Sequence, residues 1–295
     1  MNEFKDLVTS DQKEANVFIC GIPNDKNSLN RKGAAYFPRT LRSASYLVPA
    51  RDLVGNSLKQ IKIYDCGDYA YEDLNKLTNE LQFNFLTKNG FHIIVGGDHS
   101  ISIPSERAFY CKCLKLNKQP VIIHLDAHLD MMQAVENNQF SNFSVLCRAS
   151  EYGYNDKNIC VIGPRVFNEE EMDYLSKHKS IDVFKSLDLR KLGVSGLAEY
   201  LVNKYADNRY LVYISFNLDV LDPSYAPSVQ NPVSFGLTNY EVSGILGALV
   251  AGLNVDTIDI VEGTPNYDPN GVTTNLTLKI IYEMLSSLIS SETVK

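Results

Sequence analysis

The sequence predicts an α/β protein in which a mostly parallel β-sheet is covered by helices on both faces. Two observations support this prediction. Short runs rich in β-branched residues alternate with longer helical patterns along the whole chain, which is the order expected of repeated strand–helix units. Several short runs, including His92–Val95 and Val121–Leu125, are apolar on both faces, as strands buried inside a parallel sheet must be.

The expected elements follow from this alternation. The strand candidates are short runs rich in β-branched residues, in order Val17–Gly21, Ile61–Asp65, His92–Val95, Val121–Leu125, Ile159–Ile162, Ile181–Phe184, Leu211–Phe216 and Thr257–Val261. The helix candidates are longer segments with helical periodicity, Arg39–Tyr46, Glu72–Thr87, Pro104–Leu116, Glu169–His178, Ser195–Tyr205, Asn239–Leu253 and Thr274–Ile289. Eight strands could also close into a barrel, which is the alternative architecture. No linker or change of composition divides the chain, so residues 1–295 are expected to form one domain.

Composition and charge exclude several classes of function. Hydrophobic residues make up 44% of the chain and charged residues 21%, which is ordinary for a globular protein. The net charge of -7 argues against a nucleic-acid partner, because the phosphate backbone would be repelled. Residues 1–16 lack the apolar core of a signal peptide, and no apolar run reaches the length of a membrane span. The six cysteines form no Cys-x-x-Cys pair, so we expect buried, reduced thiols in a cytoplasmic protein.

Three short polar stretches, Gly96–Ser100, Asp126–Asp130 and Ser215–Asp219, each follow an apolar run. Ligands of open α/β sheets bind outside the carboxyl ends of the strands, which is where these stretches are expected to lie. Within the second stretch Asp126, His128 and Asp130 alternate, so an extended backbone would point them to one side. In the first stretch a Gly-Gly pair allows an unusual turn before the histidine.

The residue types in these stretches indicate a metal site. Carboxylate oxygens with imidazole nitrogens suit Mn²⁺, and also Zn²⁺ or Fe²⁺, whereas the lack of a thiolate disfavours a structural zinc site. Each stretch alone is a weak signal, but their joint placement after three strands is a strong one. Two further histidines, His92 and His124, lie within apolar runs and are expected to be core residues or to support metal ligands.

These motifs resemble those of the ureohydrolase family, which comprises arginases, agmatinases and formimidoylglutamases. The resemblance covers nearly the whole chain. The matching segments are Gly-Gly-Asp-His-Ser at 96–100, Asp-Ala-His-Leu-Asp at 126–130, Ser-Phe-Asn-Leu-Asp-Val-Leu-Asp-Pro at 215–223, Asp-Ile-Val-Glu at 259–262, and an N-terminal stretch with Arg31, Gly33, Ala34, Pro38 and Arg42. The agmatinase branch is the most similar, because Glu262 is followed by Pro265, Tyr267 and Asp268.

The resemblance implies a three-layer α/β/α sandwich with an eight-stranded, mostly parallel sheet. It also implies two Mn²⁺ ions per subunit and hydrolysis of a C–N bond in a linear guanidine or amidine. By position, His99, Asp126 and Asp130 would hold one ion, and His128 and Asp219 the other, with Asp126 bridging both. In this scheme a hydroxide generated between the ions attacks the guanidinium carbon.

Two catalytic residues are implied by the same resemblance. Asp130 would orient the nucleophile and pass a proton to the leaving amine. Glu262 would pair with the nitrogens of the substrate guanidinium, because a carboxylate matches that planar cation.

The chain departs from the family at several positions. Asn217 stands where the family has an aspartate that contacts both ions, so metal affinity should fall by roughly 10–100-fold or more, most of all near His128 and Asp219. Asn142 replaces a histidine that is a proposed proton shuttle, and becomes a candidate substrate-binding residue. Phe143 and Phe235 are expected to add bulk near the pocket mouth.

Three functions remain open at this point. The first is agmatinase-like hydrolysis of a small cationic guanidino substrate, in which agmatine and water give putrescine and urea. The second is formimidoylglutamase-type hydrolysis, motivated by Asn142, with Arg165 as the candidate basic group for an acidic substrate. The third is a regulatory or structural protein with impaired metal binding, motivated by Asn217. The resemblance also implies a homo-oligomer, trimeric or hexameric.

Overall fold

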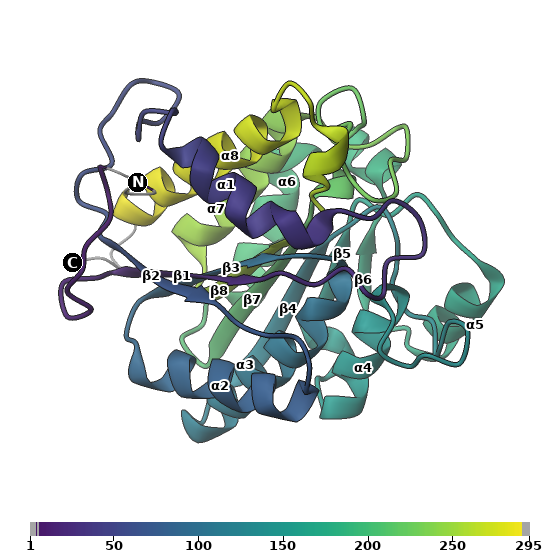
Figure 1. The fold of residues 1–295 in the computed structure, drawn as a ribbon. Helices are drawn as coiled ribbons and strands as arrows, with labels where there is room; N and C mark the ends of the chain where they lie inside the picture. The colour runs from purple at the N-terminus through teal and green to yellow at the C-terminus, as the bar shows by residue number, and fades with distance from the viewer. Residues whose placement is uncertain (1–3, 5, 291–295) are drawn as a thin grey trace.

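The computed structural model describes residues 4 and 6–290, which form an eight-stranded parallel sheet between two layers of helices (Figure 1). The sheet order is β2-β1-β3-β8-β7-β4-β5-β6. The strands are β1 Val17–Ile22, β2 Ile63–Asp68, β3 Phe91–Gly96, β4 Gln119–Leu125, β5 Ile159–Ile162, β6 Asp182–Phe184, β7 Tyr210–Asn217 and β8 Val255–Val261. All eight predicted strands are present, and β2 and β6 are the two edge strands of an open sheet and do not pair with each other, so the barrel alternative is wrong.

The helices cover both faces of the sheet, as the alternating pattern predicted. In Figure 1, α1, α6, α7 and α8 lie on one face, and α2, α3 and α4 on the other. The helices are α1 Phe37–Ser45, α2 Leu74–Thr87, α3 Ser102–Lys115, α4 Val145–Tyr152, α5 Glu169–Lys177, α6 Ser186–Tyr205, α7 Asn239–Gly252 and α8 Val272–Ser290. This is the three-layer α/β/α sandwich that the sequence predicted.

Alternate residues of the central strands pack into two separate cores. On β4, Val121 and Ile123 are buried in the core that includes Leu249 of α7, whereas Ile122 between them joins the core that includes Phe109 of α3. Burial on both faces explains why the strand is an unbroken apolar run. The two cores hold the sheet rigid, so the loops at its carboxyl edge project from fixed positions.

Two helices differ from the prediction. Helix α4 was not predicted, because its eight residues, about two turns, are too few for a clear periodicity; it ends at Gly153, whose φ is 108°. The start of α6 was predicted at Ser195 instead of Ser186. Gly193 lies inside α6 with the non-helical angles φ 71° and ψ 166°, and this kink interrupts the sequence pattern.

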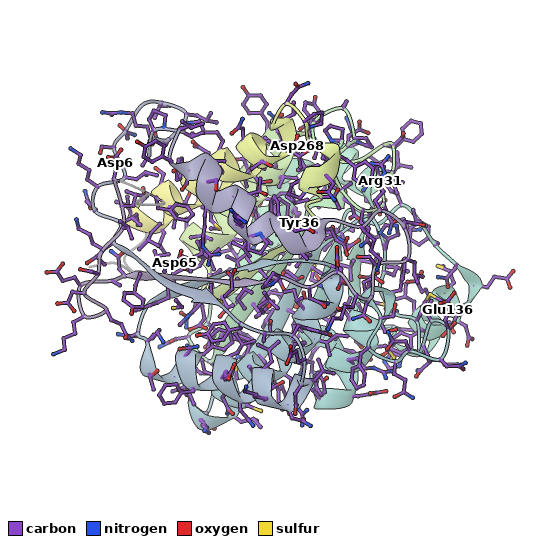
Figure 2. All side chains as sticks on the ribbon, in the orientation of Figure 1. Asp6, Arg31, Tyr36, Asp65, Glu136 and Asp268 are labelled. Atoms are coloured by element: carbon purple, nitrogen blue, oxygen red, sulfur yellow. The ribbon has the colours of Figure 1, made fainter. Side chains whose placement is uncertain are left out.

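All six cysteines lie in the described part of the chain, and none forms a disulfide. Four are buried, whereas Cys66 and Cys111 are half-buried, so the prediction of buried thiols is wrong for these two. Among residues 4 and 6–290, no helix has the length and apolarity needed to cross a membrane. Figure 2 locates two residues used below: Asp65 on β2 and Arg31 before α1 lie toward opposite sides of the view.

Candidate metal centre

The predicted site residues come together where four adjacent central strands end. His99 follows β3, Asp126–Asp130 follows β4, Asn217 ends β7, and Glu262 follows β8. The sheet order β3-β8-β7-β4 makes these strands neighbours, although they are far apart along the chain. The carboxyl edge of the sheet therefore gathers every polar stretch that the sequence analysis singled out.

The second stretch reaches the site by turning, and not by the extended backbone that we expected. Strand β4 ends at Leu125, and Asp130 has a left-handed φ of 52°. An aspartate tolerates this conformation better than most residues do. The three side chains of Asp126, His128 and Asp130 do converge, as predicted. The predicted cause, alternation along an extended strand, is wrong, because the positive φ of Asp130 is not a strand conformation.

The Gly-Gly pair before His99 permits a close approach between two backbones. A Cβ atom on Gly97 would lie 1.7 Å from the carbonyl oxygen of Asn24. Any side chain at this position would push the 24–31 loop away from the site. The glycine is thus needed for space, whereas the sequence analysis had invoked an unusual turn.

Two histidines and three aspartates interlock at the centre of the site. His99 Nδ1 lies 3.0 Å from Asp126 Oδ2 and 2.8 Å from Asp130 Oδ2. His128 Nδ1 lies 3.2 Å from Asp126 Oδ1 and 3.1 Å from Asp219 Oδ2. Asp126 therefore uses one oxygen toward each histidine, which is the arrangement that a bridging ligand requires.

The negative charge of the three buried aspartates favours the binding of a cation. Burial, followed by repulsion from Asp126, raises the pKa of Asp130 to about 7. Burial alone would lower the pKa of His128, but attraction to Asp219 and hydrogen bonds to Asp126 and Asp219 raise it to about 12. Among the described residues, no lysine or arginine forms an ion pair with the three aspartates. The histidines can carry the balancing protons only until a cation replaces them.

The donor atoms fit a divalent cation. Ligand atoms of Asp126, His128 and Asp219 lie within 4.8 Å of one another, and so do those of His99, His124 and Asp126. Buried oxygen and imidazole donors of this kind suit Mn²⁺. His124, which was predicted to be a core or supporting residue, is fully buried, and its ring stacks on that of His99 with centroids 4.6 Å apart.

Asn217 lies in the middle of this cluster, where the sequence placed it. Its Nδ2 donates a hydrogen bond of 2.7 Å to Asp126 Oδ2, and its Oδ1 accepts one of 3.0 Å from the Asp219 backbone N–H. The amide nitrogen of Asn217 thus donates to the Asp126 carboxylate, and the amide oxygen accepts from the backbone of the local turn. Asn217 adds no charge to the cluster.

Glu262 is buried beside the cluster, and one of its carboxyl oxygens has no hydrogen-bond partner among the described residues. Its Oε1 accepts a 2.7 Å hydrogen bond from the His99 backbone N–H, while Oε2 has no hydrogen-bond partner among the described residues. The φ of Glu262 is 71°, a strained value for a glutamate. Burial raises the pKa of Glu262 well above its usual range. No basic side chain pairs with it in the described structure, so a structural salt bridge does not explain it.

A hydrogen-bonded chain behind His99 was not found from the sequence. His99 Nε2 lies 2.9 Å from Ser215 Oγ, which donates a 2.8 Å hydrogen bond to Asp259 Oδ1. A metal-binding histidine usually has such a partner on its other ring nitrogen, and the partner fixes the ring orientation. The available signal was the position of Ser215 two residues before Asn217 on the same strand face.

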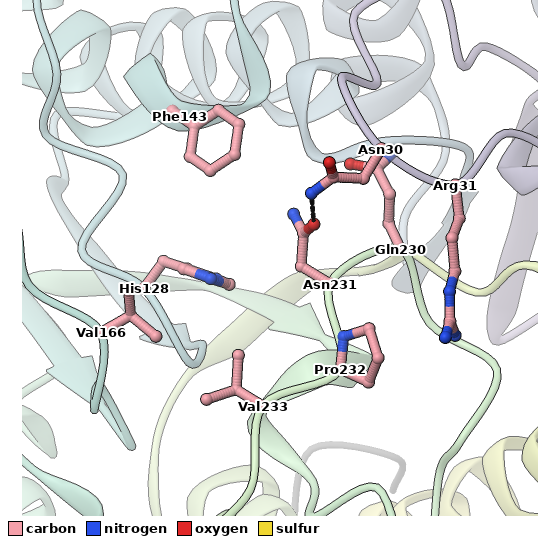
Figure 3. Close-up of a pocket in the computed structure, with 9 residues that line it drawn as sticks. All are labelled: Asn30, Arg31, His128, Phe143, Val166, Gln230, Asn231, Pro232 and Val233. Atoms are coloured by element: carbon pink, nitrogen blue, oxygen red, sulfur yellow. Dashed lines mark hydrogen bonds between the residues drawn. The ribbon is translucent and has the colours of Figure 1, made fainter.

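A pocket of about 470 Å³ opens outside the cluster, and His128 belongs to both (Figure 3). Its lining residues come from four loops: Asn30, Arg31, His128, Phe143, Val166, Gln230, Asn231, Pro232 and Val233. Phe143 lines the pocket as expected, whereas Phe235 is not among these residues and is 84% exposed. Asn142 is buried behind the pocket wall, where it donates a 3.0 Å hydrogen bond to Gln230 Oε1.

Arg165 does not provide the basic group that an acidic substrate would need. Its guanidinium donates hydrogen bonds to main-chain carbonyls, including 2.6 Å to Asp219, 2.8 Å to Val233 and 3.1 Å to Ser234. These contacts tie the loop after β7 to the loop that carries Val233. The prediction for Arg165 is therefore wrong, because its donors are occupied by the backbone.

The family model described as "Arginase family" matches residues 15–286. The chain belongs to the arginase family. A solved agmatine ureohydrolase of Thermoplasma volcanium is 28% identical with a TM-score of 0.86, and the match covers 98% of this chain and 94% of that one. The proclavaminate amidinohydrolase of Streptomyces clavuligerus is 29% identical over 91% of this chain and 87% of that protein.

More distant members share the arginase-like fold. Trypanosoma cruzi formiminoglutamase, solved with Mn²⁺, is 19% identical with a TM-score of 0.87, and the match covers 98% of this chain and 99% of that one. At this identity the likeness concerns the fold alone. Family membership makes this chain a metal-dependent hydrolase of linear amidines by descent, while the relatives differ in their substrates.

Proposed function

We propose that this arginase-family protein hydrolyses a guanidino compound at the carboxyl edge of its sheet, with agmatine as the substrate that the sequence motifs favour. The observation that carries the proposal is Asp126, which places one oxygen beside His99 and the other beside His128. A carboxylate shared in this way between two groups of ligands supports a pair of Mn²⁺ ions.

His99, Asp126 and Asp130 would hold one ion, and His128, Asp126 and Asp219 the other. Bound divalent cations of this kind lower the pKa of water and so supply a hydroxide nucleophile near neutral pH. Asn217 would contribute at most a neutral oxygen, and only if its amide turned over, because its nitrogen now faces Asp126. We therefore expect weaker metal binding than in relatives with an aspartate at this position.

Glu262 would bind the substrate and Asp130 would move the proton. The unpartnered Glu262 Oε2 is a buried acceptor that suits a guanidinium N–H donor. Asp130, which lies 2.8 Å from His99 Nδ1, would accept a proton from the attacking water and release it to the leaving amine. With agmatine, water adds to the guanidinium carbon, the C–N bond to the chain breaks, and the products are putrescine and urea.

A formimidoylglutamase-type reaction is the second candidate, supported by Asn142. This residue stands at the proposed proton-shuttle position and makes its hydrogen bond to Gln230 of the pocket wall. A substrate carrying a formimidoyl group would release formamide instead of urea. A regulatory or structural role is the third candidate, because Asn217 removes one charged ligand.

The test combines metal analysis with product analysis. The full chain is incubated with Mn²⁺, its bound metal is counted, and urea, ammonia and formamide release is measured from agmatine, arginine and formimidoylglutamate. Bound Mn²⁺ with urea from agmatine supports the agmatinase-like reaction, and formamide supports the second candidate. Absence of both tight metal binding and turnover would leave the regulatory or structural role.

Further expectations concern the whole protein. We propose that residues 1–295 act as one catalytic domain, in a cytoplasmic homo-oligomer. The six free cysteines are consistent with a reducing compartment. Light scattering of the purified chain distinguishes a trimer or hexamer from a monomer.

A further inference from the structure

Gln230 lies where several loops at the carboxyl edge of the sheet meet. It lines the pocket of Figure 3 and is almost completely buried, with 1% of its surface exposed. Its own segment follows β7, and the residues to which it is hydrogen-bonded follow β1, β4 and β8. A buried amide group needs partners for its donor and its acceptor, so this one residue connects loops that are far apart in the sequence.

The side chain of Gln230 bridges two of these loops. Its Oε1 accepts the 3.0 Å hydrogen bond from Asn142, in the segment between β4 and α4, and its Nε2 donates to Ser28 Oγ, in the loop after β1. Ser28 Oγ in turn donates to Oδ2 of the fully buried Asp98, at 3.5 Å. The four side chains therefore form a continuous hydrogen-bonded chain, in which each donor faces the next residue and the last acceptor is a carboxylate.

The main chain of the same segment holds Glu262. The Gln230 N–H donates a 3.3 Å hydrogen bond to the Glu262 carbonyl, and the Thr264 N–H donates one of 2.9 Å to the Ser228 carbonyl. These two hydrogen bonds flank a short antiparallel bridge between the two segments. On its other side Glu262 donates its own N–H to the Gly97 carbonyl, at 2.8 Å. The backbone of Glu262 is thus held from both sides.

Glu262 needs this support because its backbone is strained. A φ of 71° is uncommon for a glutamate, and such a conformation persists only where the surrounding structure holds it. If the segment that contains Gln230 moved away, Glu262 would relax toward a negative φ. Its carboxylate would then turn away from the position in which Oε1 accepts from the His99 N–H and Oε2 is left for a ligand.

From these contacts we propose that Gln230 is a positioning residue for Glu262. Its side chain connects residues 228–230 to the loops after β1 and β4, and these residues in turn hold the Glu262 carboxylate toward the substrate guanidinium. The effect on substrate rests on the proposed function of Glu262. The hold on the Glu262 backbone does not, and it is measurable without any substrate.

The experiment begins with Gln230→Met, which removes both side-chain hydrogen bonds at a similar volume and keeps the backbone N–H. Hydrogen exchange of the Glu262 and Thr264 amides should become about tenfold faster or more, because two buried hydrogen bonds are lost. Calorimetric titration with agmatine in excess Mn²⁺ should show binding about tenfold weaker. Gln119→Met, the same change at an exposed position at the start of β4, is the matched control and should alter neither quantity.

Ser28→Ala tests whether the chain of hydrogen bonds carries the effect. It removes one partner of Gln230 and should give a smaller acceleration of exchange and a smaller loss of agmatine affinity. Added to Gln230→Met it should change little more, because both substitutions act through the same chain. Ser28→Ala also keeps the Gln230 side chain, so it carries the test if Gln230→Met does not fold.

The outcomes separate this inference from the proposed function. Unchanged exchange at Glu262 and Thr264 would overturn the role of Gln230, and so would faster exchange with unchanged agmatine affinity, which indicates a purely structural residue. Additive effects of Ser28→Ala and Gln230→Met would overturn it as well. Faster exchange in a protein whose unmodified chain does not bind agmatine keeps the hold on Glu262 and rejects agmatine as the substrate. Urea release from agmatine with the same KM in Gln230→Met keeps hydrolysis and rejects the positioning role.

Discussion

The edge and the centre of the sheet hold two acidic clusters that are neutralised in opposite ways. At the edge strand β2, Arg42 makes a 2.7 Å ion pair with Asp65 and a 2.5 Å ion pair with Asp68. At the centre, the carboxylates of Asp126, Asp130 and Asp219 pair with histidines, and none of them forms an ion pair with an arginine or lysine among the described residues. The first cluster contains its own permanent cation, and the second does not.

This difference separates a structural cluster from a binding site. Burial alone would lower the pKa of Arg42, but the hydrogen bonds that its guanidinium donates to Asp65 and Asp68 raise this pKa above its usual value, so the guanidinium stays charged. In the centre the carboxylates compete for protons, and the pKa of Asp130 rises to about 7. Buried carboxylates that lack a lysine or arginine partner are expected to bind divalent cations when these are available.

The largest expected effect is the loss of metal binding in Asp126→Asn. This change removes the one carboxylate that contacts both histidines, so Mn²⁺ affinity should fall by about 1,000-fold or more. Calorimetric titration with Mn²⁺ measures the affinity, and electron paramagnetic resonance counts the bound ions. The comparison between the two clusters fails if Asp126→Asn binds Mn²⁺ as tightly as the unmodified chain.

Asp65→Asn is the matched control in the edge cluster. It also neutralises a carboxylate at a strand of the same sheet, but one already paired with Arg42. Mn²⁺ affinity should stay within about twofold, since the binding of the ions does not depend on this residue. The expected cost is about 1 kcal/mol in the free energy of unfolding, because Asp65 is partly exposed.

The next effect is on stability alone, in Arg42→Met. The change leaves Asp65 and Asp68 close together without their cation, which should lower the free energy of unfolding by about 2–3 kcal/mol. The value is below that of a fully buried pair because Asp68 is 42% exposed. Urea-induced unfolding measures the loss, and Mn²⁺ titration of the folded variant should match that of the unmodified chain. A fall in metal stoichiometry would show that the clusters are coupled.

The same contrast explains what could be predicted from sequence. The buried strands were found because burial on both faces makes each an apolar run, and the ligands were found because three of these runs end in Asp and His. The conformation was harder to predict. The positive φ of Asp130 is set by the packing of its loop, and the carbonyls that surround Arg165 come from distant loops. The spacing of residues in the sequence therefore predicted which side chains supply metal-binding donor atoms. It could not predict which charged side chains are already occupied by hydrogen bonds in the folded protein.

Asn217→Asp should convert the central cluster toward full two-ion binding. An aspartate adds one negative charge and ends the hydrogen bond that the amide donates to Asp126 Oδ2. Mn²⁺ affinity should rise by about 10–100-fold, mainly for the ion near His128 and Asp219. Titration of both forms, with the number of bound ions, measures the change. If Asn217→Asp leaves the Mn²⁺ affinity unchanged, then residue 217 does not influence metal binding, and having asparagine there instead of aspartate has no effect on the site.

The smallest effect is expected where the central cluster meets the sheet core, in Ser215→Ala. The serine hydroxyl connects His99 Nε2 to Asp259, so its loss leaves the ring free to tilt and removes a partner from a buried carboxylate. Mn²⁺ affinity should fall by about tenfold, whereas Ser215→Thr keeps the hydroxyl and should restore most of it. A purely structural serine would lower the free energy of unfolding in Ser215→Ala and leave the Mn²⁺ affinity of the folded protein unchanged. If Mn²⁺ affinity instead changes with the presence of the hydroxyl, independently of stability, then Asp259 orients His99 through Ser215. The edge cluster differs, because there Arg42 itself orients the carboxylates of Asp65 and Asp68.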